Sequence, residues 1–322
     1  MIKVALVGIG GMGGCHFGCY KNIKDAEVIA VCDVRTDMAK EKVNNENIHI
    51  YSDFDELLAN EKPDMVDICT PSYMHREMSI KALEHGLNVL CEKPMSLSSN
   101  DTAAIIAAAE KSGKLFMTAH VVRFMTPYMY LREIINSNEL GGLLRLNMKR
   151  ISSVPRWSWE DWMRDIKKSG GVPIDLSIHD IDFVQYVLGE PNEVRGVHKK
   201  LADDNDFIVS ELVYDNCIVT TEGGWYKYGL EFSAEYFAIF ENGILEYKGG
   251  KLYKNNEEIE LKTGAISDDT GINISGVDGY GGEIEYFVNC VKDGKKPTVV
   301  TPESSQSSVK LVERILKNTI EI

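Results

Sequence analysis

The sequence predicts an α/β protein in which a doubly wound parallel sheet is followed by an α+β domain with an open, mostly antiparallel sheet. In the N-terminal part, short apolar runs alternate with helical patterns up to about residue 120, which is typical of βαβ units. Beyond residue 190, β-type runs follow one another with turn residues between them, which favours antiparallel pairing. Because 322 residues exceed the usual size of one hydrophobic core, we expect two domains, at 1–122 and 123–322.

The first domain is predicted to contain six strands separated by helices. Helical patterns at His75–Glu84 and Asn100–Lys111 end near Gly86 and Gly113, and glycine commonly terminates helices. The predicted strands are Ile2–Val7, Val28–Cys32, Ile48–Tyr51, Met65–Thr70, Asn88–Cys91 and Leu115–Ala119.

The second domain is predicted to begin with a helix at Pro127–Asn138 and a strand at Leu143–Ile151, followed by a long amphipathic helical stretch at Ile174–Leu188. Helices near Gly282–Lys292 and Ser304–Thr319 are expected to close the chain. The further predicted strands are Glu193–His198, Phe207–Tyr214, Ile218–Trp225, Glu231–Phe240 and Gly243–Tyr247.

Composition and charge disfavour several kinds of partner. The formal net charge of −14 disfavours nucleic acid and anionic membrane surfaces, because both reward a basic face. No run approaches the roughly eighteen apolar residues of a membrane span, and Met1 leads into a strand without a leader pattern, so we expect a cytoplasmic protein. The seven cysteines form no Cys-x-x-Cys pair, so we expect no metal; Cys15 and Cys19 could hold one, but packing is favoured for them.

A dinucleotide-binding motif follows the first predicted strand. Gly8, Gly10 and Gly13 match Gly-x-Gly-x-x-Gly between a strand and a helix, where a pyrophosphate meets free backbone N–H groups; the alternative is a structural turn. Asp33 ends the second strand twenty residues after Gly13, where a carboxylate accepts hydrogen bonds from ribose hydroxyls and repels a 2′-phosphate. We therefore expect a Rossmann domain that binds NAD. Arg35 could stack on adenine or pair with a phosphate, which leaves NADP possible.

Residues at the carboxyl ends of later strands complete the expected cofactor site, since open α/β sheets bind their ligands there. His75 lies five residues beyond the fourth strand and could equally be a residue that begins a helix. The expected cofactor-binding residues are Gly8, Gly10, Gly11, Met12, Gly13, Asp33, Arg35, Thr70, Pro71, His75, Glu92 and Lys93.

Two segments offer groups for the proton transfer that oxidation of an alcohol requires. Lys93 follows a strand end, and a lysine partly desolvated near a cationic nicotinamide would have a lowered pKa; the alternative is a solvated lysine. Asp175 and His179 are four residues apart in a helical pattern and share one face; the alternative is a pair that only stabilises the helix. The preceding Gly170-Gly171 permits a close backbone approach to a ligand or to the other domain.

Five motifs occur in order along the chain, namely Gly8-x-Gly10-x-x-Gly13, Asp33, Glu92-Lys93-Pro94, Arg123-Phe124 and Gly170-Gly171-x-x-x-Asp175-x-x-x-His179. This set resembles the family of glucose–fructose oxidoreductase, inositol 2-dehydrogenase and rhizopine catabolism (Gfo/Idh/MocA) proteins over essentially the whole chain. The resemblance implies that Lys93 contacts the substrate hydroxyl and tunes or relays its proton, and that His179 is the general acid/base. It also implies that Asp175 binds substrate hydroxyls and orients the imidazole. Dimers or tetramers formed through the second sheet are further implied.

Several other residues are candidates for substrate contact. Arg123 and His120 follow the sixth strand and could reach substrate or ribose, although Arg123 could equally form an inter-domain ion pair. Tyr280 lies between two glycines, which often only make a turn. Three aromatic residues could stack on a sugar, with core packing as the alternative; they are Trp157, Trp159 and Trp162. The expected substrate-binding residues are Lys93, Arg123, Trp162, Asp175, His179 and Tyr280.

The sequence therefore predicts an NAD(P)-dependent oxidoreductase that transfers a hydride between nicotinamide and a carbinol carbon of a sugar, cyclitol or related polyol. Two alternatives stay open. One is an NAD-binding regulatory or scaffold protein without turnover, and the other is a redox-neutral enzyme in which NAD assists glycoside processing. The excess of acidic residues favours neutral substrates over sugar phosphates, unless Arg123 binds the phosphate.

Overall fold

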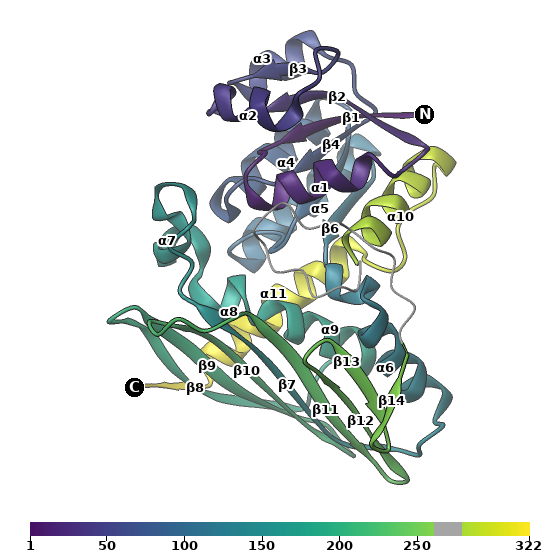
Figure 1. Ribbon diagram of the computed structural model, residues 1–322, viewed down its shortest axis with the longest axis vertical. Coiled ribbons are helices and arrows are strands. Elements are labelled where there is room, and N and C mark those ends of the chain that lie inside the picture. The colour runs from purple at the N-terminus through teal and green to yellow at the C-terminus, as the bar shows by residue number, and fades with distance from the viewer. Residues whose placement is uncertain (261–278) are drawn as a thin grey trace. The chain divides into compact units, whose positions relative to one another are not determined.

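The computed structural model describes residues 1–260 and 279–322, which form two compact units (Figure 1). Among these residues, unit 1 comprises 1–121 and 279–306, and unit 2 comprises 122–260 and 307–322. The N-terminal segment of unit 1 ends one residue before the expected end of the first domain at residue 122. Unit 1 also includes the C-terminal segment 279–306, which a single boundary assigns to the second domain.

Unit 1 is built on a six-stranded parallel sheet with the order β3-β2-β1-β4-β5-β6. This is the order of the doubly wound dinucleotide-binding fold, so the predicted Rossmann class is confirmed. The core of the sheet is apolar because helices cover both faces, and Val4 to Leu6 in the central strand are fully buried. The strands are β1 (Ile2–Val7), β2 (Ala26–Cys32), β3 (His49–Tyr51), β4 (Met65–Ile68), β5 (Asn88–Glu92) and β6 (Phe116–Ala119).

Side-chain caps mark the starts of two helices of unit 1. The Asp53 side chain accepts a hydrogen bond from the N–H of Glu56, and Ser98 accepts one from Asp101, which places the starts of α3 and α5. Gly113, with a φ of 67°, ends α5 in the left-handed conformation. Helix α10 packs against α1 and contacts β1, β5 and β6. The helices are α1 (Gly11–Tyr20), α2 (Thr36–Val43), α3 (Phe54–Asn60), α4 (His75–Glu84), α5 (Ser99–Ser112) and α10 (Tyr280–Asp293), with a 3₁₀ turn η1 (Ser72–Met74).

The described part of unit 2 contains a nine-stranded sheet with the order β14-β13-β12-β11-β7-β10-β9-β8-β15. Strand β7 pairs in parallel with β10, and β15 with β8, whereas the other pairs are antiparallel; the mostly antiparallel prediction is confirmed. Burial alternates along β9 and β11, so only one face of the sheet is covered. The strands are β7 (Leu143–Ser153), β8 (Glu193–Ala202), β9 (Asn205–Val213), β10 (Ile218–Tyr226), β11 (Ser233–Phe240), β12 (Gly243–Lys248), β13 (Lys251–Lys254), β14 (Glu257–Ile259) and β15 (Thr319–Glu321).

The predicted helical stretch Ile174–Leu188 is two helices instead of one. The N–H groups of Leu176 and Ser177 both bond to the carbonyl of Val172, which offsets the next turn. The junction lies tightly on β10, where a Cβ on Gly223 would come within 2.0 Å of the Ser177 Oγ. The helices of unit 2 are α6 (Thr126–Ser137), α7 (Ile166–Ser169), α8 (Gly171–Asp175), α9 (Ile178–Leu188) and most of α11 (Pro302–Lys317), with 3₁₀ turns η2 (Val121–Phe124) and η3 (Trp159–Arg164).

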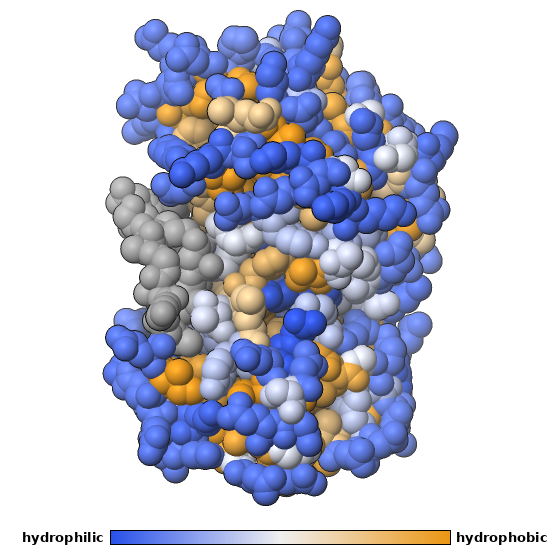
Figure 2. Space-filling view, turned by 90° about the vertical axis from the view of Figure 1, so that its right-hand side faces the viewer, coloured by the Kyte–Doolittle hydropathy of each residue, from blue (hydrophilic) through white to orange (hydrophobic). Residues whose placement is uncertain are grey.

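Strands β13, β14 and β15 were not expected from the sequence, since each has at most four residues. Hydrophilic residues dominate the face shown in Figure 2, with smaller hydrophobic patches between them.

None of the helices in the described ranges is long and apolar enough to cross a lipid bilayer.

Candidate functional site

The glycine-rich loop between β1 and α1 has the geometry of a dinucleotide-binding turn. Gly8 has a φ of 86°, and a Cβ there would lie 2.7 Å from the carbonyl oxygen of Cys69. A Cβ on Gly13 would lie 1.8 Å from the Gly8 carbonyl oxygen, so this glycine allows α1 to pack against the loop. A Cβ on Gly10 would meet no atom closer than 3.6 Å, which leaves room for a ligand. The first turn of α1, with Gly11 and Met12, has no side-chain cap, so its N–H groups suit a phosphate.

Asp33 is buried at the end of β2 and is tied to this loop. Its Oδ2 accepts a hydrogen bond from the N–H of Ile9 at 3.0 Å. The Arg35 guanidinium donates from Nε to Oδ1 and from Nη2 to Oδ2, each at 3.1 Å. Burial raises the pKa of Asp33, but the hydrogen bonds from Arg35 and Ile9 lower it more, so the carboxyl is an anion at neutral pH. Arg35 thus pairs with Asp33, and its contact with adenine or a phosphate stays a prediction.

Lys42, on α2, contacts this loop and was not expected from the sequence. Its Nζ donates to the carbonyl oxygens of Ile9 and Gly10, at 3.0 and 2.9 Å. Burial lowers the pKa of Lys42, and nearby Arg35 lowers it further. No spacing rule places a lysine of a separate helix against the glycine turn, so only the structure could show it. Together with the open Gly10, the uncapped helix start and the anionic Asp33, this loop fits NAD.

The Asp33→Ser variant is expected to bind NAD about 10–100-fold more weakly and NADP more tightly than the wild type. The carboxylate acceptor for the ribose hydroxyls is lost, and such charged hydrogen bonds contribute about 1.5–3 kcal/mol. Arg35 also loses its two hydrogen bonds to Asp33, and its guanidinium becomes able to bind a 2′-phosphate. Isothermal titration calorimetry with each dinucleotide measures both effects. The double variant Asp33→Ser/Arg35→Ala is the control and should lose the gain in NADP affinity; an unchanged preference in the single variant contradicts the assignment.

Thr70, Pro71 and His75 connect β4 to α4. The ring of His75 is buried, with Nδ1 2.7 Å from the carbonyl oxygen of Pro94 and Nε2 2.9 Å from that of Thr70. Burial lowers the pKa of His75, although both carbonyls oppose this. His75 therefore links the turn after β4 to the turn after β5, and its contact with a cofactor stays a prediction.

Lys93 directly follows Glu92, the last residue of β5, and is partly exposed. The Oε2 of Glu92 accepts a hydrogen bond from the Lys93 N–H at 3.0 Å, and its Oε1 lies 3.1 Å from the Nε2 of His16. The Lys93–Pro94 peptide bond is cis. Burial raises the pKa of Glu92, but His16, Lys93 and His75 together lower it more, so this carboxyl is also an anion. The backbone of Lys93 is thus held at the carboxyl edge of the sheet, where this fold binds ligands.

The glycine pair Gly170-Gly171 has positive φ angles of 80° and 67°, but its close approach is to a side chain of unit 2. A Cβ on Gly171 would lie 2.8 Å from the Oδ2 of Asp206, in β9. That oxygen accepts a hydrogen bond from the Val172 N–H at 2.9 Å, at the start of α8. The other Asp206 oxygen lies 2.8 Å from the Nε2 of His198. The close packing of Gly171 against Asp206 therefore requires a glycine for structural reasons. The expected approach of this segment to a ligand stays a prediction.

Asp175 is the last residue of α8, and His179 is the second residue of α9. Asp175 is buried and His179 is half-buried. Because the two helices are offset at Leu176–Ser177, these side chains do not share the single continuous helix that their spacing predicts. Both belong to unit 2, whereas Lys93 belongs to unit 1, so the meeting of the three groups at one substrate stays a prediction.

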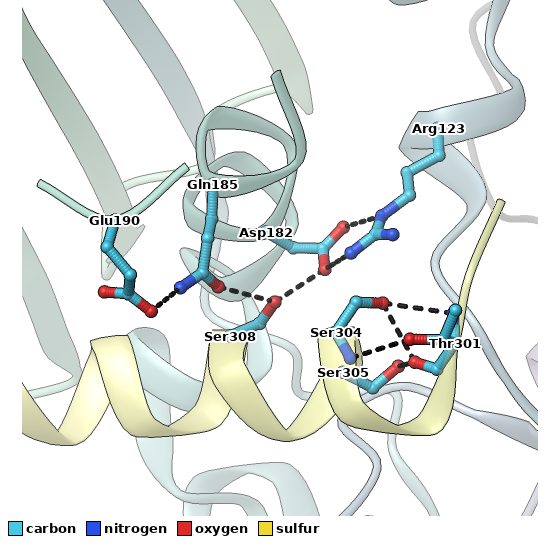
Figure 3. Close-up of polar contacts among 8 residues, drawn as sticks. All are labelled: Arg123, Asp182, Gln185, Glu190, Thr301, Ser304, Ser305 and Ser308. Atoms are coloured by element: carbon cyan, nitrogen blue, oxygen red, sulfur yellow. Dashed lines mark hydrogen bonds and ion pairs between the residues drawn. The ribbon is translucent and has the colours of Figure 1, made fainter. Parts of the chain in front are cut away.

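Arg123 is buried within unit 2, where it forms an ion pair with Asp182 (Figure 3). The Nε and Nη2 atoms donate to the two carboxylate oxygens at 2.9 and 2.6 Å. The hydroxyl of Ser308, on α11, donates to the same carboxylate at 2.7 Å. The Cζ atom of Arg123 lies 4.4 Å from the centroid of the Tyr186 ring, which is a cation–π contact. Arg123 therefore forms an ion pair, as the alternative interpretation predicted, but the pair lies within unit 2 and does not join two domains. Its contact with substrate stays a prediction.

Trp157, Trp159 and Trp162 are not core residues, so core packing, the alternative given for these three, is wrong. Trp157 has 68% of its surface exposed and Trp159 has 36%, while Trp162 is partly exposed. Sequence alone could not distinguish a surface loop from a core here, because aromatic residues occur in both.

Tyr280 and His120 are two further candidates for substrate contact. Tyr280 begins α10 in unit 1, with its ring centroid 6.3 Å from that of His16. His120 is buried and follows β6.

Comparisons with known proteins agree with this geometry. Residues 2–120 match the model of an oxidoreductase family with an NAD-binding Rossmann fold, and residues 128–246 match the GFO/IDH/MocA C-terminal domain. The chain is 30% identical over 266 residues to an inositol 2-dehydrogenase of Arthrobacter sp., covering 78% of this chain and 74% of that protein. It is 32% identical over 232 residues to a 2,7-anhydro-N-acetylneuraminate hydratase of Mediterraneibacter gnavus, covering 69% of this chain and 61% of the hydratase.

A solved structure shares the fold of the described chain. The oxidoreductase from Agrobacterium radiobacter, in complex with NAD⁺, L-tartaric acid and magnesium, superposes with a TM-score of 0.82 at 18% identity. The match covers 98% of this chain and 96% of that one. Since both halves of the sequence match the family models and the first carries the glycine loop and Asp33, the chain belongs to the Gfo/Idh/MocA family of NAD-binding oxidoreductases.

Proposed function

We propose that this protein transfers a hydride between the nicotinamide of NAD and a carbinol carbon of a sugar, cyclitol or related polyol. The main support is a lysine held by its backbone at the carboxyl end of β5, in a chain whose glycine loop fits NAD. The similarity to an inositol 2-dehydrogenase supports the substrate class. Neutral polyols suit the excess of acidic residues better than sugar phosphates do.

The chain's own residues have separate tasks in this proposal. When bound, NAD supplies the acceptor for the hydride that leaves the carbinol carbon. His179 takes the proton of the hydroxyl group as the C–H bond breaks, and the reverse reaction uses the same group as the acid. Asp175 binds neighbouring hydroxyls and orients the imidazole. Lys93 contacts the reacting oxygen and tunes or relays its proton, so an alcohol and NAD⁺ give a carbonyl, NADH and one proton.

A substrate screen tests the proposal. Unphosphorylated sugars, inositols and glycosides are incubated with the full chain and NAD or NADP, and the absorbance of reduced nicotinamide is followed. At least one neutral polyol is expected to give a steady increase with NAD. If NAD binds but none of these compounds is oxidised, and no corresponding carbonyl compound is reduced by NADH, the dehydrogenase proposal fails; a binding partner that responds to NAD would then favour a regulatory protein.

A redox-neutral reaction is the second candidate, and the similarity to a hydratase favours it. In that reaction the substrate would be oxidised while NAD holds its hydride, an elimination or addition would become easier, and the hydride would return to the product. The site residues would be the same. Chromatography of substrate and product alongside the absorbance measurement separates the two cases, because a redox-neutral cycle consumes substrate without accumulating NADH.

The open face of the second sheet is proposed to join subunits into dimers or tetramers. Val197 and Val209 are cross-strand neighbours and are 37% and 43% exposed, with Ile218 also exposed. The Val209→Glu variant is expected to reduce the mass measured by size-exclusion chromatography with light scattering, because it places a charge in an apolar contact. Met129→Glu, at an exposed site on α6, is the control. If both variants keep the wild-type mass and that mass exceeds the monomer, a different surface joins the subunits.

A further inference from the structure

A cluster of ionisable side chains lies in the interior of unit 1, between α1, β4, β5 and α10. His16 is at its centre and is fully buried. Its Nδ1 is 2.9 Å from the Oδ2 of Asp67, and its Nε2 is 3.1 Å from the Oε1 of Glu92. A neutral imidazole has one N–H group and an imidazolium has two, so only the charged ring donates to both carboxylates. Burial lowers the pKa of His16, but Asp67 and Cys69 together raise it more, so the pKa lies well above its ordinary value.

Glu283, on α10, brings a third carboxyl group to this cluster. It is fully buried, and neither of its oxygens has a hydrogen-bond partner among residues 1–260 and 279–322. One of these oxygens lies within 4.8 Å of both the His16 ring nitrogen and the Glu92 oxygen. An ionised carboxylate without a partner at such a site is very costly, whereas a neutral carboxylic acid is tolerated.

The charges around Glu283 lead to the same conclusion. The groups that face it are Glu92 from β5, Asp67 from β4, His16 and Cys15 from α1, and Tyr280 from α10. The His16 imidazolium can balance only one of the two carboxylates it contacts, so an ionised Glu283 would add a second unbalanced negative charge. Burial raises the pKa of Glu283 well above its usual value, and Glu92 raises it further.

Glu92 connects this cluster to Lys93. One Glu92 oxygen contacts His16, and the other accepts the Lys93 N–H. A carboxylate has about four lone-pair sites, so Glu92 can accept one more hydrogen bond. A hydrogen bond from Glu283 to Glu92 would require the Glu283 carboxyl group to move from its position within 4.8 Å of the Glu92 oxygen. That bond would fix the plane of the Glu92 carboxylate, and with it the backbone from which the Lys93 side chain extends.

We propose that Glu283 is a neutral carboxylic acid that donates a hydrogen bond to Glu92, and that it is thereby a positioning residue for Lys93. The inference rests on the proposed function, in which Lys93 contacts the substrate hydroxyl. The Glu283 proton stays on Glu283 throughout the reaction. Its task is to hold Glu92, so a neutral amide can replace it and an apolar side chain cannot.

Two variants of similar size separate positioning from the filling of space. With the NAD-loaded full chain and a substrate from the screen, Glu283→Gln is expected to keep kcat within about threefold of the wild type. Glu283→Leu is expected to lower kcat about tenfold or more with little change in the affinity for NAD, since small displacements of a reacting group are costly. Circular dichroism checks that both variants are folded. Equal kcat values for the two variants would show that Glu283 only fills space or that its ionised form is needed, and would overturn the proposal.

Infrared spectroscopy tests the acid without any substrate. The wild type is expected to show a carbonyl band of a protonated carboxyl group at neutral pH, and Glu283→Gln should lack it. If the band is present but no polyol is turned over, the proposed function fails while the protonated state of Glu283 is supported. If the band is absent, Glu283 is not a neutral acid, and the proposal is overturned even when the enzyme is active. Elemental analysis covers the remaining case, because the spacing of His16, Glu92 and Glu283 also suits a divalent cation. One metal ion per chain, lost in Glu283→Gln, would overturn the proposal.

The pH dependence of stability gives an independent measurement. Because the pKa of Glu283 in the folded chain lies above its unfolded value near 4.5, its stabilising contribution is complete below that value. The contribution is lost as the pH rises through the folded pKa. Glu283→Gln should therefore gain stability relative to the wild type as the pH rises, measured as the difference between their urea midpoints. Parallel curves for the two proteins up to alkaline pH would contradict a buried acid with a raised pKa.

Discussion

Replacing Lys93 or His179 by alanine is expected to lower kcat by about 10²–10⁴-fold on the substrate that the screen identifies. His179→Ala removes the proposed general acid/base, and Lys93→Ala removes the group proposed to contact the reacting oxygen. Steady-state kinetics with saturating NAD measure both effects. The affinity for NAD should change far less, because the glycine loop and Asp33 are untouched in both variants.

Two control variants have the same chemical change at exposed positions of unit 1. Lys111→Ala lies near the end of α5, and His85→Ala follows the end of α4. Both should keep wild-type kcat. If Lys93→Ala or His179→Ala keeps kcat within about threefold, which is less than the usual loss of an acid–base group, the corresponding role is wrong. If only His179→Ala lowers kcat, the protein is still a dehydrogenase, but Lys93 does not take part in the reaction.

Much of the fold could be predicted because local patterns and the final structure agree in unit 1. Strand β1 has the predicted bounds Ile2–Val7, since an apolar run buried on both faces is followed directly by the glycine turn. Helix α4 also has the predicted bounds, His75–Glu84. Errors arise where residues distant in sequence decide the outcome. The break between α8 and α9 is an example, because it lies against Gly223 in a strand that comes more than thirty residues later.

The candidate site shows the same division. The glycine spacing and Asp33 could be predicted because the motif and its place after a strand are both local. The pairing of Arg35 with Asp33 could not, since an arginine two residues away can turn toward the acid or toward a ligand. The contact of Gly171 with Asp206 depends on a residue 35 positions later. Glu283 gave no signal, because a glutamate on a helix is ordinarily exposed.

Two buried ion pairs lie beneath the sheet of unit 2. Arg150 donates to Asp180 at 2.7 Å, and Arg123 donates to Asp182 at 2.6 Å. The acids are two residues apart on α9, so their side chains leave the helix in different directions. Burial raises the pKa of Asp180, and Arg150 opposes that shift. Since a buried charge without its partner is costly, α9 depends on both pairs being complete.

Asp182→Leu is expected to lower the free energy of unfolding by about 3–5 kcal/mol, because it removes the Asp182 carboxylate from the buried Arg123 guanidinium. The double variant Arg123→Met/Asp182→Leu should recover most of that loss, since apolar side chains of similar volume replace the whole pair. Urea denaturation of the full chain measures both, and Glu235→Gln, which breaks the more exposed pair with Lys149, is the control with a small effect.

The same double variant decides between the two roles of Arg123. If Arg123 only completes the ion pair, recovery of stability should also restore KM for the substrate, because the fold of α9 is then intact. If Arg123 also binds substrate, stability should recover while KM stays raised about tenfold or more, as expected for a lost charged hydrogen bond. A double variant as unstable as Asp182→Leu would contradict the ion-pair account itself. The loss would then come from other contacts of Asp182, such as the hydrogen bond from Ser308.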